Sequence, residues 1–266
     1  MTVTDAFERD GFVRLAGAVP AADVAAMADA VWAELRARHG VERHDPATWA
    51  PTATSGLGRL RKRDAFAALG SPVVRAAVTE VAGSCRPADW GGPLVTFPEP
   101  GSWAVPRGGW HLDVPVRGAP ETTLAVKWLG YLEPVRPQAG GTVVLAGSHR
   151  LVAAWQDRTP STDPGRSPDV RDAIFALDPW FGVLTADEHG PQRERALTTG
   201  ARVDGVDVRV VELHGEAGDV VLLHRHLLHA AAPNSGSAAR VMVTGGVYDR
   251  RAIGDSSGRS GGPRTS

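Results

Sequence analysis

The sequence contains very little cysteine and no long apolar run. Its single cysteine, Cys85, cannot form a disulfide within the chain, which favours a reducing compartment, and a small buried side chain is its simplest interpretation. Nowhere do about 18 consecutive apolar residues occur, and the amino terminus, MTVTDAFERDGF, lacks a basic segment followed by an apolar one. We therefore expect a soluble cytoplasmic protein.

An excess of either charge is also absent. Lys and Arg together number 29 against 30 Asp and Glu, which gives a net charge of -1. A chain of this charge lacks the positive surface expected of a protein that binds nucleic acid or an anionic membrane. We expect a small-molecule partner, and the sequence leaves the oligomeric state open.

The length of 266 residues suits one domain with one sizeable core. After a short apolar strand at residues 12–15, apolar residues at helical spacing predict a helix over residues 20–39. A second helix is predicted where Ser71 can act as the N-cap and Gly83 can end the element. Residues 44–63 between the two helices show no period and predict a loop.

After Trp90 the pattern changes to short β-type runs broken by Gly and Pro. The runs are Leu94 to Phe97, Thr122 to Leu132, Thr142 to Leu145, Val206 to Leu213, Asp219 to His224 and Arg240 to Tyr248. Most of the gaps between them hold no long helix, which favours an antiparallel barrel or jelly roll over alternating β and α units. The fold class is therefore mainly β with flanking α-helices.

One long gap, residues 151–205, predicts an insertion near the barrel mouth. It carries a helical pattern that starts at Ser167, and its aromatic residues Phe175, Trp180 and Phe181 either pack it onto the barrel or line a substrate pocket. Packing is the commoner reason. We expect a single domain over residues 1–254 and a disordered Gly/Ser/Arg-rich tail over residues 255–266.

The residues that indicate chemistry are His111 and Asp113. In extended backbone, side chains two residues apart point to the same side, so this pair can supply two corners of a metal site. A second, distant histidine would complete the two-His, one-carboxylate set that leaves positions open on a non-heme Fe(II). With nine histidines in the chain, a His-x-Asp triplet alone is weak evidence.

Three histidines compete for the third corner: His224, His226 and His229. His229 is favoured because a turn-forming segment, residues 233–237, separates it from Arg240, so that the chain can return antiparallel and bring Arg240 back nearby. A guanidinium presents a planar fork to a carboxylate and suits an organic acid co-substrate. Taken alone, Arg240 is equally well a surface arginine.

Several linked motifs resemble the phytanoyl-CoA dioxygenase family. They are Trp-His-x-Asp at 110–113, Gly-Gly-Thr-Val-Val-Leu-Ala-Gly-Ser-His-Arg at 140–150, Gly-Asp-Val-Val-Leu-Leu-His at 218–224, His229 with Pro233-Asn234, and Phe-Glu-Arg-Asp-Gly-Phe-Val at 7–13. The resemblance runs from about residue 7 to residue 250.

This resemblance implies a double-stranded β-helix (jelly roll, cupin-like) barrel. It also implies that His111, Asp113 and His229 hold Fe(II). Arg240 would hold 2-oxoglutarate, in a site lined by Trp128. The implied reaction consumes O₂ and 2-oxoglutarate, releases succinate and CO₂, and oxidises a small organic molecule, most simply by hydroxylation. No further catalytic side chain is implied, and Asn234 and Ser148 match positions that we interpret as structural.

Two departures from the family pattern concern the co-substrate. Ala231 stands where some relatives carry a hydroxyl that helps to bind 2-oxoglutarate, and Thr96 stands where some carry a longer polar or basic residue. Both put secondary co-substrate contacts in doubt. Asp113 itself disfavours halogenation, because relatives that halogenate carry a small residue there.

Two other functions stay open from the residues alone. A zinc-dependent hydrolase or lyase could use the same three ligands with a metal-bound water, but it offers no role for Arg240. A non-catalytic barrel could bind a small molecule without metal. Trp103 and Trp110 near the ligands suggest an apolar or mixed organic substrate, and the Arg-rich, Lys-poor composition suggests bacterial secondary metabolism.

Overall fold

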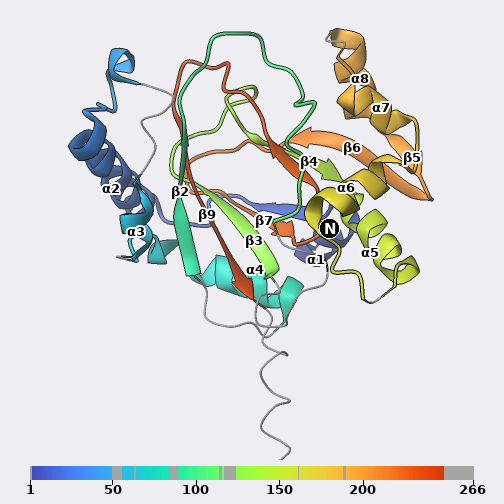
Figure 1. Ribbon diagram of the computed structural model, residues 1–266. Coiled ribbons are helices and arrows are strands. Elements are labelled where there is room, and N and C mark those ends of the chain that lie inside the picture. The colour runs from blue at the N-terminus through green and yellow to red at the C-terminus, as the bar shows by residue number, and fades with distance from the viewer. Residues whose placement is uncertain are drawn as a thin grey trace, which may run out of the picture.

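The computed structural model describes residues 2–49, 56–62, 64–83, 89–113, 116, 124–160, 162–187 and 190–248. Cys85 and the tail predicted over residues 255–266 lie outside the described residues. The described chain forms two antiparallel sheets between two groups of helices (Figure 1).

The first sheet has five strands in the order β1-β7-β3-β9-β2. Their bounds are β1 Phe12–Leu15, β7 Val220–His224, β3 Leu124–Tyr131, β9 Arg240–Tyr248 and β2 Asp89–Thr96. The second sheet has four strands in the order β5-β6-β4-β8. Their bounds are β5 Ala201–Val203, β6 Val206–Glu212, β4 Thr142–Ala146 and β8 His229–Ala231.

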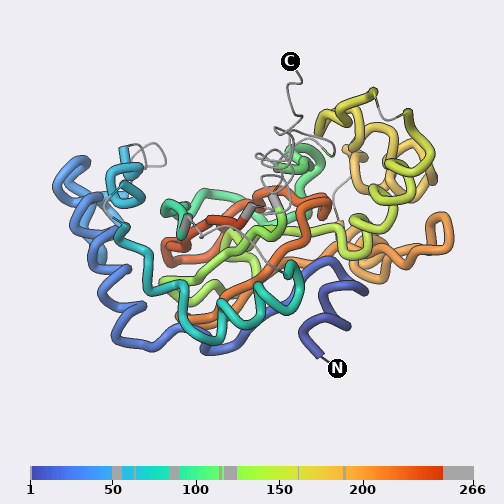
Figure 2. The backbone as a smooth tube through the Cα atoms, turned by 90° about the horizontal axis from the view of Figure 1, so that it is seen from below, coloured from blue at the N-terminus to red at the C-terminus, as the bar shows by residue number. Residues whose placement is uncertain are grey.

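The helices form two groups, one packed on the first sheet and the other on the second, and Figure 2 shows both from below. The amino-terminal group comprises α1 Val3–Asp10, α2 Ala21–His39, α3 Gly58–Lys62 and α4 Pro72–Ala82, with two short 3₁₀ helices, η1 Pro46–Thr48 and η2 Ala67–Leu69. The other group comprises α5 Ser148–Arg158, α6 Ser167–Phe175, α7 Trp180–Thr185 and α8 Pro191–Thr199. No helix among the described residues is both long and apolar enough to cross a membrane.

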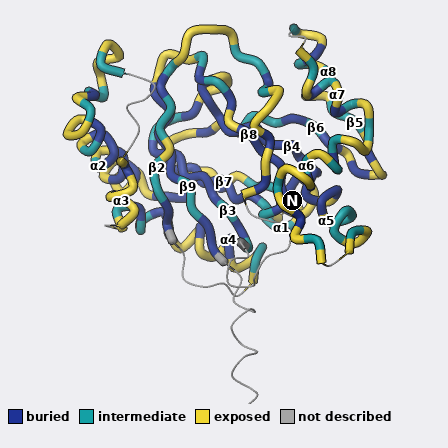
Figure 3. Tube along the Cα trace, in the orientation of Figure 1, coloured by how far each residue is buried: buried dark blue, intermediate teal, exposed yellow. Residues whose placement is uncertain are grey.

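Three apolar clusters hold these layers together, and the buried strands stand out against the exposed outer surfaces of the helices in Figure 3. One cluster joins α2 and α4 to the first sheet and includes Val31, Leu35 and Trp128. A second cluster joins the helices α5, α6, α7 and α8 to the second sheet. The third includes Leu129 of β3 and Val144 of β4 and fills the space between the sheets. Apolar burial on both faces of each sheet therefore fixes the order of the layers.

The structure confirms the mainly β architecture with flanking helices. All paired strands are antiparallel, and each predicted β run becomes a strand within a few residues of the expected bounds. Ser71 caps α4 by accepting the backbone N–H of Val74, as expected. The predicted loop over residues 44–63 also contains η1 and α3. Closure of the two sheets into a barrel stays a prediction.

The expected antiparallel return of the chain after His229 is wrong. β8 belongs to the four-stranded sheet and β9 to the five-stranded sheet, so the intervening turn carries the chain from one sheet to the other. Asn234 holds this crossing: its side chain donates to the carbonyls of Thr96 and Ala238 and accepts the N–H of Gly236. The side chain is fully buried, which agrees with the structural role predicted for it.

The insertion packs against the outer face of the second sheet. Phe181 is buried, its ring lies 5.1 Å from that of Phe175 and 5.3 Å from that of Trp180, and all three belong to the cluster on that face. Trp110 joins the same cluster and donates its indole N–H to Pro106. These aromatic residues act in packing, so we assign no substrate pocket to them.

Candidate metal and co-substrate site

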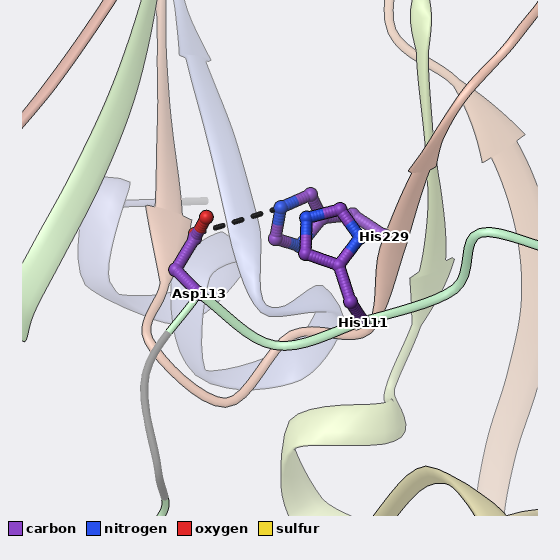
Figure 4. Close-up of side chains that lie close together, drawn as sticks. All are labelled: His111, Asp113 and His229. Atoms are coloured by element: carbon purple, nitrogen blue, oxygen red, sulfur yellow. Dashed lines mark ion pairs between the residues drawn. The ribbon is translucent and has the colours of Figure 1, made fainter. Parts of the chain in front are cut away.

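The backbone brings His111 and His229 together. The two residues form an antiparallel bridge in which the N–H of each donates to the carbonyl of the other, at 3.0 and 3.2 Å. Side chains that are directly opposite in an antiparallel pair lie on the same face and close together. The two imidazole rings accordingly lie with their centroids 4.4 Å apart (Figure 4).

Backbone carbonyls fix which nitrogen of each ring faces the site. The Nδ1 atom of His111 lies 2.7 Å from the carbonyl of Gly109, and that of His229 lies 2.9 Å from the carbonyl of Leu227. Because a carbonyl can only accept, each Nδ1 must carry the proton and donate it. When each ring is neutral, its lone pair is therefore on Nε2, which is the orientation that a metal-binding histidine needs.

Asp113 completes the group of three. Its Oδ2 lies 3.5 Å from the Nε2 of His229, and the three ligand atoms all lie within 4.8 Å of one another. Among the described residues, no other group of three or more His, Cys, Asp and Glu side chains lies this close together. Two imidazoles and one carboxylate form a donor set that suits Fe(II) and leaves further coordination positions open.

The protonation states fit metal binding. Burial lowers the pKa of His111, which keeps its lone pair available at neutral pH. Burial would raise the pKa of Asp113, but the neighbouring His229 and the ammonium of Lys127 outweigh it and hold that pKa well below its usual value. The carboxylate is therefore ionised over the whole physiological range.

Ser148 helps to fix the position of His229. Its hydroxyl accepts the backbone N–H of Leu228 at 3.0 Å, next to the histidine in the chain, and the side chain is fully buried. Gly147, with a φ of 84°, makes the turn from β4 into α5 that delivers this serine. The Ala-Gly-Ser-His segment thus acts in structure, as expected.

Arg240 lies at the start of β9 and is buried. Its guanidinium donates to the carbonyl of Gly140 and, at 2.6 Å, to the hydroxyl of Thr96, while its Nε has no partner. Burial lowers its pKa to about 10, so it stays charged at neutral pH. Within the described part of the chain, no carboxylate forms an ion pair with Arg240. Burial of an unpaired charge is unfavourable, so an anionic ligand would stabilise this guanidinium.

One of the two groups that Arg240 contacts lies on the same pair of chain segments as His229. Val144 pairs with His229, and further along Ala139 forms a bridge with Asn234, next to the carbonyl that Arg240 contacts. His229 and the Gly140 carbonyl that Arg240 contacts therefore lie along the same pair of chain segments, at the edge of the second sheet. Tyr131 faces the space between the sheets, and its buried hydroxyl has no partner. Burial raises the pKa of Tyr131 well above its usual value, although the positive charge of Arg240 opposes this rise.

Trp128 is not brought together with these residues. It is fully buried on the helix-facing side of β3, and its ring lies 4.9 Å from that of Trp90. Successive side chains of a strand point to opposite faces, so Lys127 and Leu129 face the interior and Trp128 faces away. The structure thus gives no support to the predicted contact with a co-substrate.

The two histidines that competed with His229 belong to another group. His224 and His226 lie with ring centroids 5.4 Å apart, and the ring of His149 lies 4.9 Å from that of His224. Neither His224 nor His226 belongs to the group formed by His111 and Asp113, so the choice of His229 agrees with the geometry.

A comparison with protein families gives a match to phytanoyl-CoA dioxygenase over residues 7–242. The chain belongs to the phytanoyl-CoA dioxygenase family. The family and the dioxygenase class that were expected from the motifs are thereby confirmed. No curated protein matches the sequence.

Solved structures share the fold of this family member at low sequence identity. The non-heme alpha-ketoglutarate-dependent carbocyclase SnoK from nogalamycin biosynthesis is 18% identical, with a TM-score of 0.57 over 96% of this chain and 88% of that one. The epimerase SnoN, solved with Fe³⁺, alpha-ketoglutarate and a nogalamycin, is 19% identical, with a TM-score of 0.51 over 93% and 82%. AviO1 from Streptomyces viridochromogenes Tue57 is 18% identical, with a TM-score of 0.52 over 93% and 94%.

In this dioxygenase-family chain, sequence reasoning missed Lys127. Its ammonium lies 2.7 Å from Oδ1 of Asp113 and 3.2 Å from Nε2 of His229. The signal was present in the sequence: Lys127 is the one charged residue in the apolar run 124–132 and one of only two lysines in the chain.

Proposed function

We propose that this chain is an Fe(II)- and 2-oxoglutarate-dependent oxygenase that uses O₂ to oxidise a small organic molecule. The observation that carries the proposal is the convergence of two imidazole Nε2 atoms and one carboxylate, in a protein that also buries a guanidinium without a counter-charge. Family membership and the shared fold with alpha-ketoglutarate-dependent enzymes support it. His111, Asp113 and His229 would hold the metal, and Arg240 would bind the distal carboxylate of 2-oxoglutarate.

The bound iron would supply the oxidising chemistry, coupled to conversion of 2-oxoglutarate to succinate and CO₂. The protein's own contribution is positioning and charge. The carbonyls of Gly109 and Leu227 orient the two imidazoles, and the fixed fork of Arg240 sets the direction in which a dicarboxylate lies. Apolar side chains between the sheets, such as Leu129 and Met242, keep water from the buried end of the site.

Hydroxylation in bacterial secondary metabolism is the finer form of this proposal. Its secondary-metabolism part is supported by the similarity to SnoK and SnoN, both from nogalamycin biosynthesis, and by the Arg-rich, Lys-poor composition. The same proteins are a carbocyclase and an epimerase, so product analysis with a given substrate decides among hydroxylation, cyclisation and epimerisation.

Succinate formation tests the proposal. Purified protein with Fe(II), 2-oxoglutarate and O₂ is expected to release succinate slowly without substrate and faster with one. We expect His111→Ala to abolish this release. His214→Ala, which removes an exposed histidine shortly after the end of β6, is expected to leave it unchanged. Equal succinate release by wild type and His111→Ala would show that the metal site is misassigned.

Metal analysis and co-substrate binding separate the alternatives. An oxygenase is expected to bind 2-oxoglutarate only with a divalent metal present. A zinc hydrolase or lyase would hold metal without this dependence, and a non-catalytic binding protein would hold none.

A further inference from the structure

Lys127 is an unusual residue for its position. It lies in the middle of β3, where its neighbours Val126 and Trp128 are buried, and its side chain is only 15% exposed. Lysine is rarely buried without a partner, because its charge must leave water and its long side chain must lose conformational freedom. Its partners here are two of the three candidate metal ligands.

The two oxygens of Asp113 face different groups. Oδ2 faces His229 at 3.5 Å, on the side where the three ligand atoms converge. Oδ1 accepts a hydrogen bond from the ammonium of Lys127 at 2.7 Å. β3 pairs with β7 on one side and β9 on the other, so the lysine stands on a strand that cannot easily move.

The number of oxygens that Asp113 offers matters for the proposed chemistry. A carboxylate binds a metal through one oxygen or through both. A facial set of two histidines and one single-oxygen carboxylate leaves three of six positions open, enough for a chelating 2-oxo acid and O₂. A carboxylate that binds through both oxygens would take one of these positions.

We propose that Lys127 is a positioning residue that keeps Asp113 a single-oxygen metal ligand by holding Oδ1. The inference rests on the proposed function and deepens it. A metal would use the Nε2 lone pair of His229, so the 3.2 Å contact of Lys127 with that atom does not persist beside a metal. The charge-assisted bond to Oδ1 is the contact that remains, and it offsets the repulsion between the ammonium and a divalent cation.

Three variants of Lys127 test this role. Lys127→Met keeps the length and removes the N–H donors, Lys127→Gln keeps a neutral donor, and Lys127→Arg keeps the charge. Lys62→Met is the matched control, because it removes the only other lysine, an exposed residue of α3. Circular dichroism and thermal unfolding identify the variants that fold. If Lys127→Met does not fold, Lys127→Gln replaces it as the test variant.

The measurements use Ni(II) and Co(II), so that no turnover is needed. We expect Lys127→Met to bind Ni(II) within about threefold of wild type, but to bind 2-oxoglutarate at least about tenfold more weakly once loaded, because the second oxygen of Asp113 then competes for a coordination position that the 2-oxo acid needs. The visible spectrum of its Co(II) form is expected to differ from that of wild type. Lys127→Gln and Lys127→Arg are expected to restore part of the affinity, and Lys62→Met to match wild type.

Each contrary result has a distinct meaning. Equal 2-oxoglutarate affinity and equal Co(II) spectra for wild type and Lys127→Met would overturn the inference and leave the proposed function standing. Weaker metal binding with unchanged 2-oxoglutarate affinity would also overturn it, because Lys127 would then act on metal retention. If wild type binds no metal or no 2-oxoglutarate, the proposed function itself fails.

Discussion

At the scale of single residues, Arg240 carries a cost that only a ligand can offset. Its guanidinium is buried, its Nε has no partner, and its two hydrogen bonds go to neutral groups. Such an arrangement gives little stability to the protein alone, since the desolvation of a charge opposes the gain from its hydrogen bonds. It is favourable when an anion enters.

This balance predicts opposite effects of Arg240→Met on folding and on binding. We expect the free energy of unfolding without ligand to change by less than about 1 kcal/mol, because lost hydrogen bonds and relieved charge burial offset each other. The affinity for 2-oxoglutarate is expected to fall by about 10- to 100-fold, the value of one charged hydrogen bond or more. Urea unfolding and calorimetric titration of the Ni(II)-loaded protein measure the two effects.

Unchanged binding of 2-oxoglutarate by Arg240→Met would show that another residue binds the distal carboxylate. Arg202→Met is the control, because it removes an arginine whose side chain is 67% exposed in an ion pair with Asp207. Exposed pairs of this kind contribute little to stability.

The sequence predicted which residues group together in the candidate site better than it predicted the faces of strands. The proximity of His111, Asp113 and His229 could be predicted because metal-binding chemistry restricts the residue types and the motif order restricts the positions. The face of β3 on which Trp128 lies could not be predicted, because β3 is buried on both faces and Val126, Trp128 and Leu129 form one apolar run without a readable period. The same burial concealed the inward direction of Lys127.

At the scale of elements, the turn between β8 and β9 joins the two halves of the site. It leads from His229 in one sheet to Arg240 in the other, and Asn234 holds it with three hydrogen bonds from a fully buried side chain. Sequence reasoning identified the turn from its Pro, Asn, Ser and Gly residues. It could not determine that the turn changes sheets, because that depends on the long-range pairing of β8 with β4.

Asn234→Ala is expected to destabilise the protein by about 2–3 kcal/mol, because it leaves buried backbone groups without partners. We also expect it to weaken 2-oxoglutarate binding, since Arg240 starts the strand that follows the turn. Ser237→Ala, an exposed position of the same turn, is expected to change neither property. Urea unfolding monitored by circular dichroism measures the loss, and a change below about 0.5 kcal/mol for Asn234→Ala would refute the role given to its side chain.

Elements were predicted where the sequence carries a local signal and missed where it does not. β9 has an apolar pattern bounded by turn residues and α4 has clear capping residues, and both appear within one residue of their expected bounds. β8 has only three residues and exists because β4 lies beside it. The predictions of a cytoplasmic location and of a disordered tail are untested and stay predictions.

At the scale of the whole molecule, a buried histidine group links stability to pH. His149 of α5, His224 at the end of β7 and His226 in the following loop lie side by side, with Arg225, Arg150 and Asp10 as charged neighbours. Burial lowers the pKa of all three, to about 2 for His224 and to about 3 for His226, and the mutual proximity of these groups adds to the effect. The folded protein therefore keeps these rings neutral.

The sign of the pH dependence follows from these shifts. An unfolded histidine titrates near its ordinary pKa of about 6.5, so below this pH the unfolded chain binds protons that the folded protein refuses. The free energy of unfolding is therefore highest well above pH 6.5, and it decreases as the pH falls toward the pKa values of these histidines in the folded protein. At pH 5.5 each such histidine lowers the free energy of unfolding by about 1.4 kcal/mol relative to neutral pH, so His224 and His226 together lower it by about 3 kcal/mol.

His226→Phe tests this linkage, because it keeps a ring of similar size and cannot be protonated. We expect the loss of unfolding free energy between pH 7.5 and pH 5.5 to be about 1.4 kcal/mol smaller in the variant than in wild type. The variant also loses a hydrogen bond to the backbone of Val116, but that loss is the same at both pH values and cancels in the difference. Urea unfolding at the two pH values, with a chelator present so that metal binding plays no part, gives the comparison. An equal loss in both proteins would mean that His226 is protonated in the folded state and that burial does not keep it neutral.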